Sequence, residues 1–144
     1  MKTALRSTLL LIFFALSIIA CSKSGSGGGG EIPPPEDENL VVKITPDPGS
    51  STTPVKANGP TYNFNIVIES KIPADGVEVK VKFTKDLDGT VIPPNDYTSS
   101  SRTTPIPITI SNLTVGEVGT VTVLVTSKTK PSNKVTKTFR LVRK

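Results

Sequence analysis

Hydrophobic residues alternate with polar ones at a spacing of two over much of the chain after residue 39, in short segments separated by prolines and glycines. Such alternation predicts strands with one buried face, because successive side chains of a strand point to opposite sides of a sheet. The expected strands are 40–44, 62–69, 77–83, 106–110, 121–125 and 135–141, with a short additional strand near Val91–Ile92. No window carries the apolar repeat of a helix, so the pattern predicts an all-β protein.

The turn signals between these segments are typical of an antiparallel sandwich of two sheets. Pro105 and Pro107 flank Ile106 and remove two hydrogen-bond donors, so this strand is expected at a sheet edge. Pro73-Ala74-Asp75-Gly76 is expected to turn the chain between two of the strongest strands. The inward-facing side chains are then mostly Val, Ile, Leu and Phe, enough for one hydrophobic core.

The segment Asn112–Gly116 resembles the approach to the penultimate strand in fibronectin type III and related Ig-like domains. In that family a Leu, and then a Gly three residues later, precede a Tyr that fixes the corner. Leu113 and Gly116 match, Gly119 stands where the Tyr would be, and the chain has no Trp. The resemblance implies that residues 39–144 form one antiparallel Ig-like β-sandwich of about seven strands. It implies no ligand.

The first twenty residues have the organisation of a secretory signal peptide, with Lys2 and Arg6 before an apolar run at 9–20. The run is shorter than the ~20 residues of a spanning helix, although an uncleaved anchor is the alternative. The junction Ile18-Ile19-Ala20-Cys21 resembles the lipobox of bacterial lipoproteins, and the layout is similar to that of Bacteroidota lipoproteins. The resemblance implies that residues 1–20 are removed and that Cys21 carries the lipid.

The same resemblance implies a cell-envelope location, with the outer membrane as the expected membrane and acyl chains as the anchor. Surface-exported lipoproteins of that group often carry acidic residues directly after the cysteine, whereas Ser22-Lys23-Ser24 follows here. The periplasmic face and the cell surface therefore both stay open. Residues 21–38 are rich in Gly and Ser and then in Pro and acids, which predicts a hydrated tether.

The composition also makes several kinds of functional site and partner less favoured. The chain has no His and one Cys, which removes the usual base of nucleophilic sites, the commonest transition-metal ligand and any internal disulfide. The net charge of +5 is spread along the chain rather than clustered on one helix, which does not favour nucleic acid as a partner. We therefore expect a monomer that is not an enzyme and needs no cofactor.

One oxygen-rich stretch is a candidate calcium site, since Asp86, Asp88, Asn95 and Asp96 would offer hard oxygen ligands if they shared a loop. The alternative is a plain turn at Asp88-Gly89, because Asp-Gly is a strong hairpin signal. Tyr97, in the segment 93–102 that we expect to be a loop with Ser99–Ser101, is the candidate contact for a sugar.

Four lysines surround the predicted tip of the last hairpin, namely Lys128, Lys130, Lys134 and Lys137. They could bind lipid phosphates, sulfated glycans or an acidic partner, or they could be a solvated tip that discourages edge pairing. The preferred hypothesis is a lipid-anchored envelope protein that presents an Ig-like structural or interaction module to an unknown protein or glycan. The alternative is a carbohydrate-binding accessory lipoprotein that uses the 86–102 segment.

Overall fold

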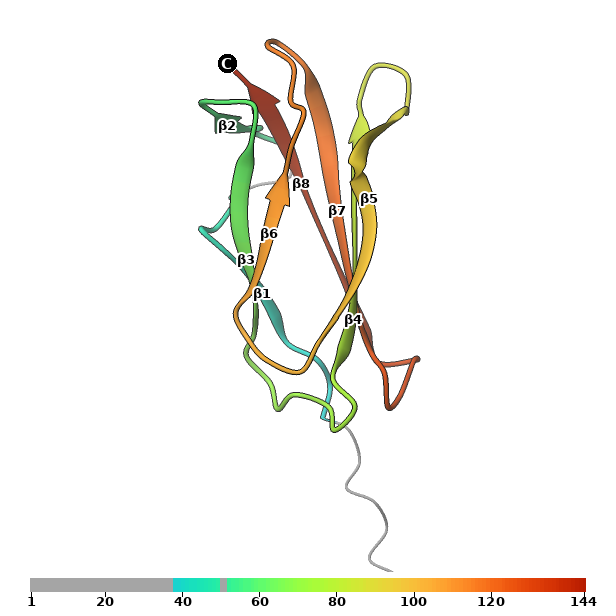
Figure 1. Cartoon of the computed structure of the whole chain (residues 1–144). Helices are drawn as coiled ribbons and strands as arrows, with labels where there is room; N and C mark the ends of the chain where they lie inside the picture. Colours follow the sequence, from blue (N-terminus) through green and yellow to red (C-terminus); the bar gives the residue numbers. More distant parts are fainter. Residues whose placement is uncertain (1–37, 50–51) are drawn as a thin grey trace, which may run out of the picture. The chain divides into compact units, whose positions relative to one another are not determined.

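The computed structural model describes residues 38–49 and 52–144, which form eight strands and, within those ranges, no helix (Figure 1). The strands are β1 (Val42–Thr45), β2 (Val55–Ala57), β3 (Tyr62–Ile68), β4 (Val77–Lys85), β5 (Val91–Ser101), β6 (Ile106–Ile110), β7 (Val118–Ser127) and β8 (Lys134–Arg143). The predicted leader, Cys21 and all of the predicted tether except Glu38 lie outside the described residues. No helix that could cross a bilayer occurs in the described ranges.

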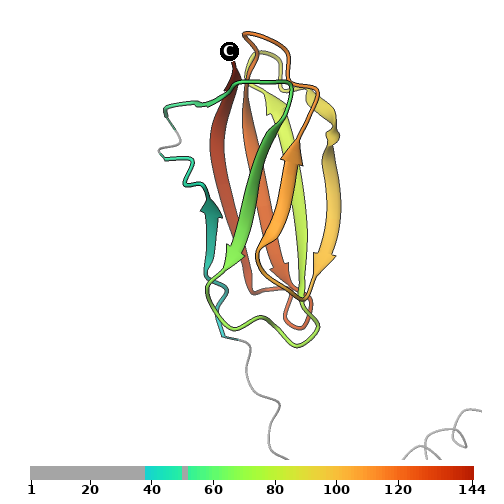
Figure 2. The same cartoon turned by 60° about the vertical axis from the view of Figure 1, so that its left-hand side comes forward.

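The strands form two facing sheets, with the order β1-β3-β6 in one and β2-β8-β7-β4-β5 in the other (Figure 2). This confirms the predicted all-β sandwich. Two details differ from the prediction, because the described ranges hold eight strands rather than about seven and β2 pairs in parallel with β8. The chain leaves β1 in one sheet, crosses to the other and continues in the same direction as β8, so that this pairing cannot be antiparallel.

The predicted alternation places the core correctly. In six of the strands, every buried apolar side chain lies on the inward face that the alternation predicts. These strands are β1, β3, β4, β6, β7 and β8, and the residues are Val42, Ile44, Phe64, Ile66, Ile68, Val77, Val79, Val81, Phe83, Ile106, Ile108, Ile110, Val121, Val123, Val125, Phe139 and Leu141. The rings of Phe64 and Phe139 meet edge to face across the two sheets, with their centroids 5.4 Å apart. Tyr62 and Val135 pack against this core while partly exposed.

The prolines of β6 lie where the sequence predicts, because β6 is an outer strand of its sheet and its partner in the described structure is β3. The expectation of a loop over 93–102 is wrong, since most of it belongs to β5, which pairs with β4 from Ser101 opposite Val77 to Asp96 opposite Lys82. The side chains of β5 do not alternate in polarity as those of β4 do. An outer strand needs one neighbour and buries little surface, so it can form without hydrophobic alternation.

Gly119 stands where the Ig-like domains that the chain resembles have a corner Tyr, and a larger side chain has no room at this position. It is buried in β7, and a Cβ built on it would run into the ring of Phe83 and the carbonyl oxygen of Thr84. The neighbouring strand therefore supplies the aromatic ring that occupies this space. A side chain at position 119 would have to displace Phe83 from the core.

Candidate functional site

The sandwich has two ends, which are formed by different connections between the strands (Figure 1). We call the end at which the described chain begins, at Glu38, the proximal end; it also holds the β3–β4 connection and the β7–β8 tip. The distal end holds the β4–β5 hairpin, the β6–β7 connection and the C-terminal Lys144. Each end contains one group of residues that the sequence analysis singled out.

A pocket of about 600 Å³ opens at the distal end, between the β4–β5 hairpin and the β6–β7 connection. Its lining is Lys85, Asp86, Leu87, Asp88, Val115, Gly116, Glu117 and Val118. Two apolar side chains project from this rim, since Leu87 is 95% exposed and Val115 is 65% exposed. Leu87 and Val115 thus give this concave surface an apolar rim, of the kind that ligand-binding surfaces use.

Ion pairs and hydrogen bonds fix the positions of charged side chains in this pocket. The Nζ of Lys85 lies 2.6 Å from Oε1 of Glu117, which joins the β4–β5 hairpin to the β6–β7 connection. Asp86 accepts hydrogen bonds from Thr120 at 2.8 Å and from the Nε and Nη2 of Arg140 at 3.0 and 2.5 Å. The pocket wall is therefore fixed by contacts between residues far apart in the sequence.

These contacts shift the pKa of three groups. The hydrogen bond and charge of Glu117 raise the pKa of Lys85. Partial burial alone would raise the pKa of Asp86, but the hydrogen bonds from Arg140 and Thr120 outweigh it, and the pKa of Asp86 is lowered. The hydrogen bonds from Thr90 lower the pKa of Asp88. All three shifts favour the charged form of the side chain.

The structure separates the four candidate calcium ligands. Asp86 and Asp88 lie in the β4–β5 turn, whereas Asn95 and Asp96 lie within β5. Asn95 is buried, and its amide accepts from the backbone N–H of Ser111 at 2.9 Å and donates to the Ser111 carbonyl at 2.7 Å. Across residues 38–49 and 52–144, no three acidic, His or Cys side chains gather in a way that could hold a metal ion. The premise of one shared loop is therefore wrong.

The alternative for this stretch, a plain turn, is what the hairpin shows. Gly89 has a φ of +70°, and Asp88 accepts the backbone N–H of Thr90 at 2.9 Å through its own side chain. Tyr97 belongs to β5, opposite Val81, and its side chain lies outside the described part of the structure. The aromatic contact that the carbohydrate alternative needs therefore stays a prediction.

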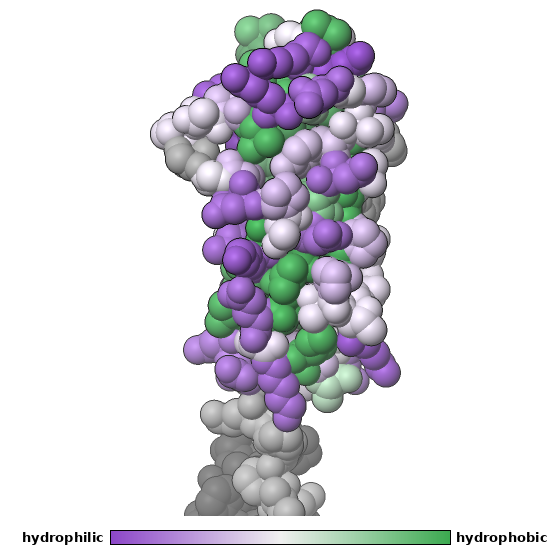
Figure 3. Space-filling view, turned by 90° about the vertical axis from the view of Figure 1, so that its left-hand side faces the viewer, coloured by the Kyte–Doolittle hydropathy of each residue, from purple (hydrophilic) through white to green (hydrophobic). Residues whose placement is uncertain are grey.

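The proximal end carries the lysine-bearing tip between β7 and β8. Lys128, Lys130 and Lys134 are all exposed, and in the described ranges none of them has a carboxylate within 4.0 Å. Lys137 is separate from this tip. It sits on the inward-facing side of β8, opposite Val123, and reaches solvent through a groove of about 400 Å³ beside β1. Figure 3 shows the face on the left of Figure 1, on which hydrophilic and hydrophobic residues are mixed. The structure thus groups three of the four candidate lysines.

Comparison with known proteins finds no matching family model, no matching curated protein and no matching solved structure. The distal pocket was not predicted from the sequence, although one signal for it was visible. Leu87 is an apolar residue in the middle of a polar Asp-Leu-Asp-Gly turn, and none of the described residues buries it. Val115 gave no such signal, because it follows the apolar Leu113 at a spacing of two.

Proposed function

We propose that this chain is a lipid-anchored cell-envelope protein that presents its β-sandwich as an interaction module and has no catalytic role. The observation that supports this proposal is that the described chain begins at one end of the sandwich and the apolar rim lies at the other. The polypeptide reaches the domain at Glu38, on the proximal end, while the apolar rim of Leu87 and Val115 lies at the opposite end (Figure 1). An anchor at Cys21 would leave the distal pocket facing away from the membrane, accessible to a partner.

Lipid attachment is tested by comparing the wild-type chain with Cys21→Ala in cells. Intact-protein mass spectrometry should show a mature chain that begins at Cys21 with the mass of added acyl groups. The variant should stay in unprocessed or soluble fractions while its domain remains folded. A cleaved, unacylated Cys21→Ala product that stays in the membrane fraction would refute the anchor.

Partner binding at the distal end is tested with Leu87→Asp and Val115→Asp. Both positions are exposed, so the substitutions should leave stability within about 0.5 kcal/mol of the wild type. Site-specific photocrosslinkers at position 87 in intact cells should give a discrete adduct that the Val115→Asp variant loses. A crosslinker at exposed Lys56 serves as the control.

The carbohydrate alternative rests on the 86–102 segment. Affinity electrophoresis with envelope and plant polysaccharides tests it, and retardation that Tyr97→Ala abolishes would favour it over a protein partner. The distal pocket adds nothing to this alternative, because its described lining is charged and aliphatic rather than aromatic.

A further inference from the structure

The lysine tip at the proximal end is a rigid feature rather than a loose turn. Its backbone is held by hydrogen bonds from Lys130 N–H to the Ser127 hydroxyl at 3.0 Å and from Asn133 N–H to the Lys130 carbonyl at 2.8 Å. The tip is also fastened to the β3–β4 turn, since Lys128 N–H donates to the Gly76 carbonyl at 3.0 Å. Lys128 and Lys130 are therefore carried at a fixed position on the domain.

The same tip also forms hydrogen bonds with the segment at which the described chain enters the sandwich. Asn133 accepts the backbone N–H of Leu40 at 2.9 Å, and its amide donates to the carbonyl of Glu38 at 2.8 Å. Glu38, where the described chain begins, therefore lies beside the lysine tip. Cys21 precedes Glu38 by 17 residues, which can span at most about 60 Å in any conformation, so an anchor at Cys21 keeps this tip near a bilayer surface.

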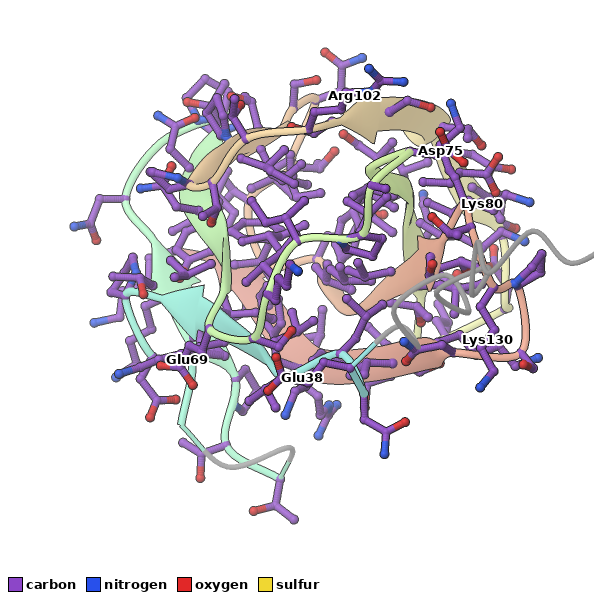
Figure 4. All side chains as sticks on the ribbon, turned by 90° about the horizontal axis from the view of Figure 1, so that it is seen from below. Glu38, Glu69, Asp75, Lys80, Arg102 and Lys130 are labelled. Carbon is purple, nitrogen blue, oxygen red and sulfur yellow. The ribbon has the colours of Figure 1, made fainter. Side chains whose placement is uncertain are left out.

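Charge at the proximal end is divided by side (Figure 4). Glu38 and Glu69 lie on one side, and Lys80 and Lys130 lie on the other. Three acids at this end have partners, because Asp75 faces Arg102 at 3.9 Å, Glu78 faces Lys80 at 3.1 Å, and the Glu38 carboxylate accepts the backbone N–H of Lys71 at 3.2 Å. The tip lysines are thus left with positive charge that the described residues do not neutralise.

The cations beside the distal pocket and those of the proximal tip differ in this respect. Beside the pocket, Lys85 and Arg140 each lie against a carboxylate, at 2.6 and 2.5 Å. At the proximal end Lys128 and Lys130 have no such partner within the described ranges. Unpaired exposed cations interact with an anionic surface only within about 8 Å at physiological ionic strength, so their position beside the tether decides which surface they meet.

We infer that the β7–β8 tip, through Lys128, Lys130 and Lys134, binds the anionic phosphate groups of the membrane to which the chain is attached, and so orients the domain with its distal pocket outward. The inference rests on the proposed lipid anchor. A bilayer is favoured over an acidic protein or a sulfated glycan because the tip adjoins the tether. Juxtamembrane lysines are attracted by anionic headgroups, and the attraction falls off with distance and salt.

The test uses the single cysteine. The chain from Cys21 to Lys144, which retains every described residue, is coupled through its thiol to a maleimide lipid in vesicles of phosphatidylcholine, with or without about 30% phosphatidylglycerol, a fraction chosen to give the negative surface potential of an anionic leaflet. The measurement is the rate at which each lysine is acetylated by a water-soluble ester, read by mass spectrometry. Lys56 and Lys144 at the distal end are exposed internal controls.

The expected result is at least about threefold slower acetylation of Lys128, Lys130 and Lys134 on anionic than on neutral vesicles, with full recovery in about 1 M salt and no change at Lys56 or Lys144. The double variant K128Q/K130Q should lose the protection that Lys134 shows in the wild type, and the matched variant K56Q/K144Q should keep it. Folding of both variants is checked by thermal unfolding, and all four positions are exposed.

Three outcomes would overturn the inference. Rates on both vesicle types equal to those of the uncoupled chain would show no contact with the bilayer, and equal protection on both would show shielding that does not depend on anionic lipid. Protection by soluble heparin but not by anionic vesicles would assign the tip to a sulfated polymer. Chemical coupling replaces natural acylation here, so a failure of this test is distinct from a failure of the Cys21→Ala experiment.

Discussion

The distal pocket and the proximal tip of one sandwich arrange their charged residues in opposite ways. In the pocket wall Lys85 pairs with Glu117, and Asp86 pairs with Arg140 behind the wall. At the proximal end the contacts that hold the structure come from a neutral amide, Asn133, and the tip lysines project without a carboxylate partner among the described residues. Paired charges fix the shape of a wall, whereas unpaired exposed charges stay available to an anionic surface that comes within about 8 Å.

This difference distinguishes charges that pair within the domain from charges that do not, which the net charge alone cannot do. The whole chain carries +5, which by itself points to no particular site. Its distribution shows which cations lie against carboxylates and which, among the described residues, do not. Substitutions that act on the shared core, on one end or on the other should therefore give separable effects, ordered below from the largest.

The largest effect should come from Phe64→Ala, which belongs to neither end. Phe64 is buried in the middle of the sandwich against Phe139, so the cavity should cost about 3–5 kcal/mol of unfolding free energy. Urea denaturation measures it. Val41→Ala, at a half-exposed position just before β1, is the control and should cost under about 1 kcal/mol. A loss at position 64 as small as at position 41 would contradict the packing described for β3.

Gly119→Ala should weaken the distal end first. The added methyl group has no room beside the Phe83 ring and the Thr84 carbonyl, so we expect a cost of about 1–3 kcal/mol. Hydrogen exchange should accelerate at the β4–β7 pairs near the distal end more than at Val77 opposite Ser127. Gly59→Ala is the matched control, because nothing lies within 4 Å of the place that its methyl group would take. A stable, unchanged Gly119→Ala protein would refute the account of the missing corner Tyr.

Asn133→Ala should act on the proximal end alone. It removes the hydrogen bonds to Leu40 and Glu38, which together should contribute about 1–2 kcal/mol. The amide of Leu40 should exchange with solvent much faster, while the amide of Gly116, bonded to the Arg143 carbonyl at the distal end, should not change. Ser132→Ala, at an exposed position of the same tip, is the control. Equal acceleration at both ends would mean that they are not independent.

Asp86→Asn should give the smallest effect, about 0.5–1 kcal/mol at neutral pH, because the pair with Arg140 is partly exposed. The pKa of Asp86 is lower in the folded chain than its ordinary value of 3.8. Its contribution is therefore present above that ordinary value and lost as the pH falls further, through the folded-state pKa. Urea titrations from strongly acidic to neutral pH should show a shallower acid loss in the variant. Asp96→Asn is the exposed control, and an equal change there would contradict the assignment.

The sequence predicts the core well and the contacts between loops poorly, for physical reasons. Alternation identifies Val79 or Ile108 as buried because the period of a strand is local. It cannot find β2, since so short a strand shows no period, nor the parallel pairing of Val55 with Leu141, which depends on a crossover between sheets. Ion pairs such as Lys85–Glu117 join distant segments and leave no local signal.

Asn95 shows the limit for candidate sites. An amide near aspartates in sequence suggested a ligand, yet its strand turns it inward and Ser111 satisfies it through both amide atoms. Residue type indicated its capacity to bind oxygen or nitrogen partners, and only the register of β5 decided which partner it meets. The lysine tip was the opposite case, because three of its members share a short hairpin whose ends the pattern already located.

The position of β1 has a mechanical consequence. A pull on Glu38 against a partner held at the distal end would run along the strand axes. The ladder between β1 and β3, from Val42 opposite Ile68 to Thr45 opposite Asn65, lies across that line of force. Its bonds are perpendicular to the strands, so they would be sheared together rather than unzipped one by one. The hydrogen bonds of Asn133 to Leu40 and Glu38 would be loaded first.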